Sequence, residues 1–295
     1  MTFVLPDRID TRPLAVLGAG TMGRRIALML ATRGAEVRLY DPNAEVRAAG
    51  VAYALKQLPR LVDKLGEGHM AGSVVGVADL GEALRDAWHV VEAVPERLDL
   101  KRTIFRQIDE LSAPDAILAS NSSSYATSAF ADSVKNPARL LNTHYLMPPQ
   151  STPVELMSCG QTDPAVIDLL AKALNGYGLT SYIVEAESMG FIFNRVWAAI
   201  KREVLCVIAQ GVAKPEVVDA IYCQAQGTRM GPCRSMDYVG LDVVLAIEEH
   251  YAHELPGLPT APRELLKKMI AEGRLGVKTG KGFYDDYPAP AAKTA

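Results

Sequence analysis

Cysteine is scarce in this chain, which has four cysteines among 295 residues. The four, Cys159, Cys206, Cys223 and Cys233, lack the paired spacing of metal ligands or of a disulfide framework. We therefore expect no metal site. The thiols are expected to be reduced and mostly buried, as in cytoplasmic proteins.

Long apolar runs and an excess of one charge are also missing. No run approaches the roughly 20 apolar residues of a membrane span, and residues 1–8 lack the charged and apolar segments of a signal peptide. The 31 basic and 34 acidic residues give a net charge of −3. We therefore expect a cytoplasmic protein whose partners include neither nucleic acid nor a membrane.

Two kinds of pattern divide the chain. Up to about residue 186, short apolar runs alternate with helical patterns, as in parallel α/β sheets. The predicted strands lie at 14–17, 36–40, 74–77, 90–94, 116–119, 140–143, 154–157 and 181–184. Beyond Gly190 the period is helical, and the predicted helices lie at 192–208, 215–225, 240–254 and 262–272. We predict an α/β domain at 1–186 and an all-helical C-terminal domain at 187–295.

A glycine motif, Gly18-Ala19-Gly20-Thr21-Met22-Gly23, lies between the first predicted strand and an amphipathic stretch. Gly18 permits a tight turn, Gly20 lets the backbone approach a pyrophosphate, and Gly23 lets helix and strand pack closely. Thr21 and Met22 open the helix, whose N-terminal N–H groups face the phosphates. The motif predicts a Rossmann-type doubly wound sheet with a dinucleotide site, and the alternative is a glycine turn in an ordinary βαβ unit.

Asp41 ends the second predicted strand, eighteen residues after Gly23. A carboxylate at this place accepts hydrogen bonds from the adenosine ribose and disfavours a 2′-phosphate. The predicted cofactor is therefore NAD rather than NADP.

A histidine and a glutamate are candidates for proton transfer. His144 follows a predicted strand, and Glu155 stands eleven residues later inside an otherwise apolar strand. A buried carboxylate is costly unless it is paired, and a histidine on the neighbouring strand is a suitable partner. Glu155 would then fix the tautomer of His144, which shuttles a proton. The alternative is a structural histidine bonded to backbone.

Two further polar groups lie where a ligand can reach them. Asn121 and Ser123 follow a predicted strand at the carboxyl edge of the sheet, where ligands bind in doubly wound folds. Their alternative role is a turn or a helix cap. Asn194 lies in the first turn of the long helix, where its amide either reaches a cleft between the domains or satisfies the helix start.

Taken as an ordered set, these motifs resemble the 3-hydroxyacyl-CoA dehydrogenase family. The resemblance covers residues 13–285 and also includes the stretches VEAVPERLDLKRTIF, GFIFNR, MGP with DYVGLD, and LGVKTGKGFY. It implies a two-domain homodimer, with dimer contacts in the helical domain, that transfers hydride between NAD and a secondary alcohol. By the same resemblance the chain would take part in fatty acid metabolism.

The resemblance also implies roles for single residues. His144 would be the general base in oxidation and the general acid in reduction, with Glu155 as its partner. Ser123 and Asn194 would hold the reacting oxygen. Glu96 and Lys101 match family positions that contact the cofactor, and their alternative is an exposed helix with solvated charges.

The sequence departs from the family pattern at two places that bear on the substrate. Met147 replaces the asparagine that usually follows the histidine, and the segment from Asp41 to Val94, where acyl-CoA enzymes cover CoA, is shortened. The stretch VPERLDLKR resembles L-gulonate 3-dehydrogenase, the lambda-crystallin branch, and carnitine dehydrogenase. The predicted substrate is an L-3-hydroxyacyl-CoA. The alternatives are a free 3-hydroxy acid or related polar alcohol, and a non-catalytic NAD-binding protein.

Overall fold

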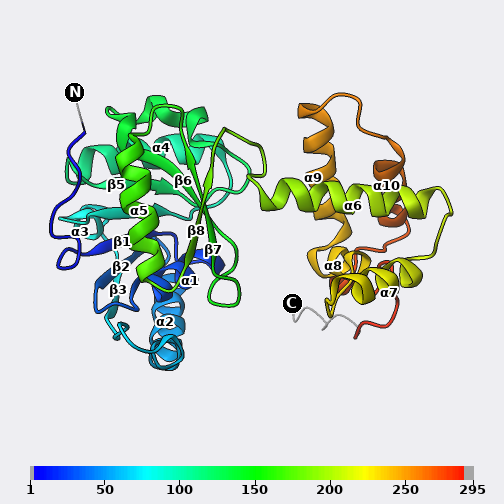
Figure 1. The fold of residues 1–295 in the computed structure, drawn as a ribbon, viewed down its shortest axis with the longest axis horizontal. Helices are drawn as coiled ribbons and strands as arrows, with labels where there is room; N and C mark the ends of the chain where they lie inside the picture. Colours follow the sequence, from blue (N-terminus) through cyan, green and yellow to red (C-terminus); the bar gives the residue numbers. More distant parts are fainter. Residues whose placement is uncertain (1–2, 289–295) are drawn as a thin grey trace. The chain divides into compact units, whose positions relative to one another are not determined.

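The computed structural model describes residues 3–288, which form two compact units divided after Ile192. The first unit contains the sheet and the second is helical, as expected (Figure 1). The strands of the first unit are β1 (Leu14–Leu17), β2 (Glu36–Tyr40), β3 (Ser73–Val77), β4 (His89–Glu92), β5 (Ile117–Ser120), β6 (Leu140–Tyr145), β7 (Pro153–Ser158) and β8 (Thr180–Val184).

The eight strands form one sheet in the order β3-β2-β1-β4-β5-β6-β7-β8. The chain leaves β3 at one edge and returns to the middle of the sheet, so that β4 pairs with β1. This is the strand order of a Rossmann-type fold, whose ligands bind beyond the carboxyl ends of the strands at that reversal. The predicted fold class is confirmed.

β7 is the strand that makes the sheet mixed instead of purely parallel. β7 pairs antiparallel with β6, whereas the other neighbouring pairs are parallel. Only residues 146–152 connect β6 to β7, and a parallel return needs a crossover of a dozen or more residues. The antiparallel pairing places His144 directly opposite Glu155.

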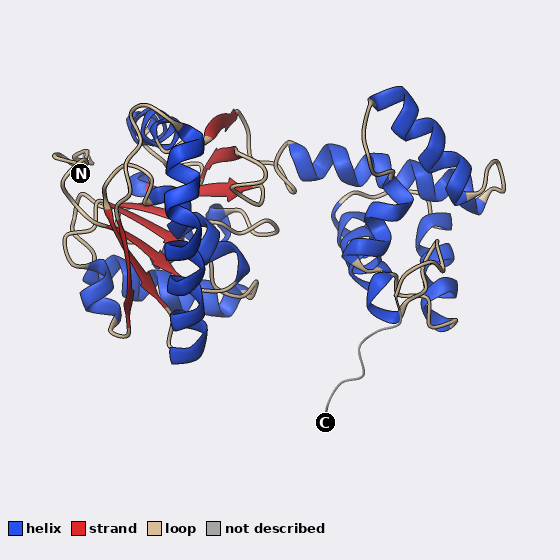
Figure 2. Cartoon of the chain, turned by 90° about the horizontal axis from the view of Figure 1, so that it is seen from below, coloured by secondary structure: helices blue, strands red, loops and turns tan. Residues whose placement is uncertain are grey.

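Alternate residues of the buried strands enter two apolar cores, one on each face of the sheet. In β1, Leu14 and Val16 belong to the core under α1, α2 and α5, whereas Ala15 and Leu17 belong to the core under α3 and α4. Figure 2 shows the strands with helices on both sides. These helices are α1 (Thr21–Leu30), α2 (Ala44–Leu65), α3 (Leu80–Leu84), α4 (Leu98–Leu111) and α5 (Pro164–Gly176), with the 3₁₀ turns η1 (Thr127–Ser133) and η2 (Pro137–Arg139).

The second unit packs its own apolar core, which includes Leu205, Met236 and Leu266. Its helices are α6 (Phe193–Ala209), α7 (Pro215–Gln226), α8 (Pro232–Val239), α9 (Leu241–Glu254) and α10 (Ala261–Ala271), followed by the 3₁₀ turn η3 (Val277–Thr279). Sequence analysis missed α8, because eight residues are too few to show a helical period. The available signal was Pro232, since proline is frequent at the first position of a helix.

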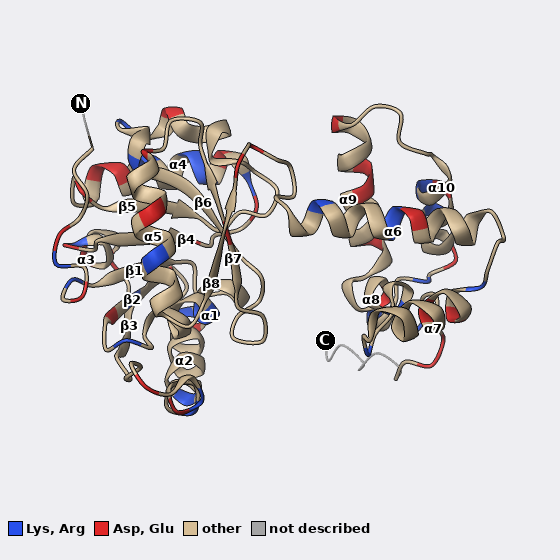
Figure 3. Ribbon diagram, in the orientation of Figure 1, with Lys and Arg blue, Asp and Glu red and all other residues tan. Residues whose placement is uncertain are grey.

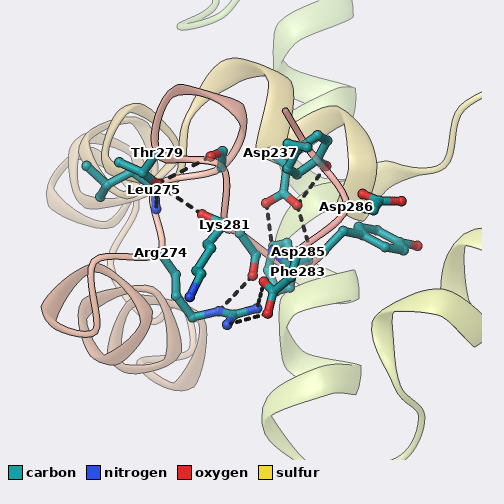
Figure 4. Close-up of polar contacts among 12 residues, drawn as sticks. Asp237, Arg274, Leu275, Thr279, Lys281, Phe283, Asp285 and Asp286 are labelled. Carbon is teal, nitrogen blue, oxygen red and sulfur yellow. Dashed lines mark hydrogen bonds and ion pairs between the residues drawn. The ribbon is translucent and has the colours of Figure 1, made fainter. Parts of the chain in front are cut away.

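A buried aspartate fastens the last described segment to this unit. Asp237 of α8 accepts hydrogen bonds from the backbone N–H groups of Phe283 and Tyr284, at 2.8 and 3.0 Å, and from the hydroxyl of Tyr287 at 2.9 Å (Figure 4). Arg234 lies over the ring of Tyr284 at 3.6 Å. We call residues 274–287 the C-terminal strap.

Charged residues of both signs are mixed in both units (Figure 3). Within residues 3–288, no helix has the length and apolar character needed to cross a bilayer. The four cysteines form no disulfide, and three of them are buried.

Candidate active site

The glycine loop follows β1 at the carboxyl edge of the sheet. Gly18 has a φ of +99°, and a Cβ there would lie 2.6 Å from the carbonyl oxygen of Ala93, so other residues are strongly disfavoured. A Cβ at Gly23 would lie 1.7 Å from the Gly18 carbonyl oxygen. A Cβ at Gly20 would instead meet no atom within 4 Å. The loop is therefore tightly packed on its inner side and open at Gly20.

The start of α1 suits an anion. The helix begins at Thr21, which is exposed, and no side chain caps its N-terminus. Its first N–H groups therefore keep their capacity to bind an anion. Met22 lies partly buried against the core. The open approach at Gly20 and the uncapped helix fit the pyrophosphate of a dinucleotide.

Asp41 connects the end of β2 to this loop. Its Oδ2 accepts a hydrogen bond from the N–H of Ala19 at 2.9 Å, and its Oδ1 accepts one from the N–H of Asn43 at 2.9 Å. Each carboxylate oxygen has a second lone pair, so these bonds leave acceptor capacity for ribose hydroxyls. Asp41 thus shapes the loop, and its predicted ribose contact stays a prediction.

His144 and Glu155 form a buried pair across β6 and β7. The His144 Nδ1 and the Glu155 Oε2 are 2.7 Å apart, and the side chains are 7% and 3% exposed. Glu155 Oε1 also accepts a hydrogen bond from the N–H of Ile192 at 2.8 Å. A carboxylate at Nδ1 favours the tautomer with its proton on Nδ1, which assigns proton exchange to Nε2. The pairing expected from the sequence is present, and His144 lies inside β6 rather than after it.

Sequence analysis missed Phe191, which stacks on this histidine. The rings of His144 and Phe191 are 4.7 Å apart and nearly parallel, with an interplanar angle of 20°. Phe191 is 2% exposed and has a φ of +57°, in a turn where its N–H donates to the carbonyl oxygen of Ser188 at 3.0 Å. The turn and the stack hold one face of the imidazole. The only sequence signal was the position of Phe191 in GFIFNR.

The loop after β5 presents Ser123 to solvent while its neighbours are held. Glu96 Oε1 accepts hydrogen bonds from the Ser122 hydroxyl and from the N–H of Ser124, the latter at 3.0 Å. Asn121 Oδ1 accepts a hydrogen bond from the N–H of Tyr145 at 3.0 Å, which joins the ends of β5 and β6. Ser123 itself is exposed.

Lys101 is buried, so its alternative interpretation as a solvated charge on an exposed helix is wrong. Its side chain is 1% exposed, and its Nζ lies 2.9 Å from Glu92 Oε1, 3.1 Å from Glu92 Oε2 and 3.2 Å from Glu96 Oε2. Burial acts to raise the pKa of Glu96, but the charge of Lys101 and the bonds from Ser122 and Ser124 outweigh it, and the pKa is lowered. Sequence analysis missed Glu92.

Two further residues that the sequence singles out, Met147 and Asn194, are described here by their local structure. Met147 follows β6, is 47% exposed and has a φ of +61°, a left-handed conformation that asparagine adopts more readily than methionine. Asn194 is the second residue of α6, in the helical unit. Its role toward the reacting oxygen stays a prediction.

Comparison with known proteins is consistent with this geometry. Residues 13–186 match the family described as 3-hydroxyacyl-CoA dehydrogenase, NAD binding domain, and residues 190–286 match its C-terminal domain. The chain is 33% identical over 283 residues to a probable 3-hydroxybutyryl-CoA dehydrogenase of Bacillus subtilis, covering 94% of this chain and 98% of that protein.

A solved structure and a more distant relative extend the comparison. The (S)-3-hydroxybutyryl-CoA dehydrogenase of Ralstonia eutropha is similar with a TM-score of 0.82 and 30% identity, over 93% of this chain and 98% of the other. The 5-formyl-3-hydroxy-2-methylpyridine 4-carboxylate 5-dehydrogenase of Mesorhizobium japonicum is 29% identical, over 92% of this chain and 90% of the other. The chain therefore belongs to the 3-hydroxyacyl-CoA dehydrogenase family and is an NAD-dependent oxidoreductase of that kind.

Proposed function

We propose that this protein interconverts an L-3-hydroxyacyl-CoA and the corresponding 3-ketoacyl-CoA. The observation that carries the proposal is the buried pair of His144 and Glu155 on adjacent strands, with Nδ1 and Oε2 2.7 Å apart. The pair supplies a positioned general base, which an alcohol dehydrogenase needs. Its place at the end of β6 puts the base at the edge of the sheet where ligands bind.

In the proposed oxidation, His144 Nε2 accepts the proton of the substrate hydroxyl as the C3 hydride leaves. The cofactor NAD, when bound, supplies the hydride acceptor. Glu155 stabilises the imidazolium that forms, because its carboxylate faces Nδ1. In ketone reduction the same nitrogen returns the proton to the carbonyl oxygen. Ser123 and Asn194 are proposed to hold that oxygen by hydrogen bonds.

The loop geometry supports the proposed cofactor residues. Gly18, Gly20 and Gly23 shape the pyrophosphate site, and the N–H groups at the start of α1, from Thr21 and Met22 onward, receive its charge. The remaining proposed contacts are Asp41 at the adenosine ribose, and Glu96, Lys101 and Asn121 toward the nicotinamide end. The contact between Lys101 Nζ and Glu96 Oε2, at 3.2 Å, supports a shared role for these two residues.

We further assign residues 1–186 to cofactor binding and residues 187–295 to substrate and dimer contacts, in a cytoplasmic homodimer. Exposed apolar side chains on α7 and α8 support the dimer. Ile221 is 66% exposed and Tyr238 is 60% exposed, whereas the buried side chain of α7 is that of Asp219. Apolar side chains exposed on neighbouring helices are typical of an interface.

The test follows NADH formation from L-3-hydroxybutyryl-CoA and from free L-3-hydroxybutyrate under identical conditions. We expect strong preference for the thioester. Preference for the free acid would overturn the substrate and leave the roles of His144 and Glu155 intact. Two observations favour that second candidate: Met147 stands where the acyl-CoA enzymes carry asparagine, and the Mesorhizobium relative is named for a pyridine carboxylate.

A further inference from the structure

Glu92 is a fully buried carboxylate outside the residues assigned above. It is the last residue of β4 and is 0% exposed. β4 is the strand at which the sheet order reverses, so Glu92 lies directly below the edge where ligands bind. A carboxylate at such a depth is costly unless every oxygen has a partner.

The partners of Glu92 come from three different segments of the first unit. Its two oxygens accept hydrogen bonds from Lys101 of α4 at 2.9 and 3.1 Å. Glu92 Oε2 also accepts one from the Ser120 hydroxyl of β5 at 2.6 Å, and Oε1 accepts one from the N–H of Val94 at 2.8 Å. One carboxylate thus joins the ends of β4 and β5 to α4.

The network continues from this buried centre to the exposed loop. The ammonium of Lys101 contacts Glu96 Oε2 at 3.2 Å, and the other oxygen of Glu96 binds the loop on both sides of Ser123, at Ser122 and Ser124. The contacts therefore run from Glu92 through Lys101 and Glu96 to the Ser123 loop. Movement of the Lys101 ammonium would be transmitted to the Glu96 carboxylate and the loop.

A contribution to stability does not by itself explain why the charged side chains of Glu92 and Lys101 are buried here. Apolar residues of similar volume often match or exceed a buried ion pair in stability, because removing charges from water is expensive. The fixed geometry of charged hydrogen bonds is what apolar packing lacks. Partners behind a functional residue commonly set its orientation.

We propose that Glu92 is a positioning residue for the cofactor site: its buried carboxylate fixes Lys101, and through Lys101 it orders Glu96 and the loop of Ser123. The proposal rests on the assignment of Lys101 and Glu96 to the cofactor. It adds a residue that touches neither cofactor nor substrate.

The first test is Glu92→Gln, which keeps the shape of the side chain and removes its charge. We expect the dissociation constant for NADH, measured by nucleotide fluorescence well below the unfolding temperature, to rise by about tenfold, the loss expected when one charge-assisted hydrogen bond is weakened. The KM for the hydroxyacyl substrate is expected to change less than the affinity for NADH, because Ser123 is the one residue of this loop that is proposed to contact the substrate. Ser120→Ala keeps the charge of Glu92 and removes two hydrogen bonds, the one that the hydroxyl donates to Glu92 and the one that it accepts from the N–H of Ser122 at 3.2 Å. A smaller loss in the same direction is expected.

The matched control is Asp109→Asn. Asp109 and Arg139 form another buried pair in the same unit, with their side chains 4% and 5% exposed and their charged atoms 2.8 Å apart. This variant should lower thermal stability about as much as Glu92→Gln while NADH affinity stays normal. An equal loss of NADH affinity in Asp109→Asn would overturn the proposal, since general destabilisation would then explain the effect.

A double-mutant cycle tests whether Glu92 acts through Lys101. If it does, Glu92→Gln combined with Lys101→Met should bind NADH no more weakly than Lys101→Met alone. Additive losses would overturn the proposal, as would normal NADH binding by both Glu92→Gln and Ser120→Ala. NADH binding is measured without turnover. The result can therefore be interpreted even if the protein does not act on the proposed acyl-CoA substrate.

Discussion

At the scale of single residues, the His144 ring is held from two directions. Glu155 binds its Nδ1 and Phe191 packs on its face, so proton exchange falls to Nε2. The contacts of Glu155 and Phe191 fix the orientation of the ring, as a positioned general base requires. This arrangement gives the first prediction.

His144→Ala should lower kcat by about 10² to 10⁴-fold, the usual loss for a general acid–base residue. NADH affinity should stay within the experimental error, because the contacts assigned to the cofactor lie on other residues. Steady-state kinetics and fluorescence titration on the same preparation measure both. Turnover close to that of the unchanged protein would remove His144 from the mechanism.

Asp41 combines a loop contact with the proposed choice of cofactor. Asp41→Asn keeps an oxygen that can accept the hydrogen bond from Ala19 but removes the negative charge that repels a 2′-phosphate. We expect NAD to bind less tightly and its advantage over NADP to shrink. The comparison is kcat/KM for the two cofactors; an unchanged ratio would mean that other residues read the ribose.

Met147 is strained, since a non-glycine residue in the left-handed region costs roughly 1–2 kcal/mol. Asparagine tolerates that region better, so Met147→Asn should raise the unfolding temperature. The control is Met230→Asn, a methionine of similar exposure, 45% against 47%, that lacks a positive φ. Calorimetry compares the two, and an equal effect in both variants would show that strain at Met147 is not the cause.

Functional residues that form a recognisable pattern in the sequence could be predicted. Residues whose partners are brought to them only by the fold could not. A glutamate in an apolar strand and a nearby histidine predicted the pair of Glu155 and His144. Phe191 and Glu92 gave no such signal, because a phenylalanine before a helix and a glutamate after valines are ordinary sequence. Their partners, His144 and Lys101, are brought to them by the sheet and by α4.

At the scale of elements, the strands buried on both faces were predictable from their apolar runs, and their ends were less so. β4 ends at Glu92, two residues before the predicted end, because the N–H of Val94 donates to the Glu92 side chain instead of to a neighbouring strand. The antiparallel direction of β7 follows from its short connection to β6, residues 146–152, which is too short for a parallel return. The helix α8 lay below the length at which periodicity can be read.

β4 also begins with a buried titratable side chain, His89, which gives a prediction on pH. His89 is 0% exposed and its Nδ1 lies 3.2 Å from the carbonyl oxygen of Ile117. Burial lowers its pKa to about 4, against 6.5 in the unfolded chain, with the bond to Ile117 acting in the opposite direction. Between these values the unfolded chain binds more protons, so the stability present above pH 6.5 falls as the pH drops toward 4.

The loss across this window should amount to about 3 kcal/mol in the free energy of unfolding. His89→Asn keeps a nitrogen donor near the position of Nδ1 and cannot titrate, so the part of the slope that His89 causes should vanish. His253→Asn is the control, because the His253 side chain is 83% exposed. Urea unfolding from pH 4 to 8 measures the slope, and an equal slope in His89→Asn would exclude His89 as its source.

At the scale of the whole molecule, the resemblance to the 3-hydroxyacyl-CoA dehydrogenases predicted the family and an α/β domain followed by a helical domain. It could not predict how the C-terminal strap is fastened, because the bonds to Asp237 come from backbone N–H groups that any sequence carries. The stretch LGVKTGKGFY holds three glycines. At two of them, Gly276 and Gly282, an added Cβ would lie within 2.1 Å of an Asp237 atom. Glycine here serves close packing against α8.

Asp237→Ala should lower the free energy of unfolding of the protein by about 2–4 kcal/mol, because it leaves two backbone N–H groups and a tyrosine hydroxyl without their acceptor. Asp242→Asn, which removes an exposed ion pair with Lys278, should change it by less than about 1 kcal/mol. Urea denaturation compares the two variants. Equal effects would mean that the strap is held by its apolar contacts instead.

The dependence of α8 on the strap also sets an order for biosynthesis. Asp237 is made some fifty residues before Tyr287, so in a nascent chain on the ribosome this acceptor exists before its donors. The last strand of the sheet unit is complete once Val184 has been synthesised, so the hydrogen-bonding partners of its strands exist much earlier. During translation the nucleotide-binding unit can therefore fold while the helical unit still waits for its last segment.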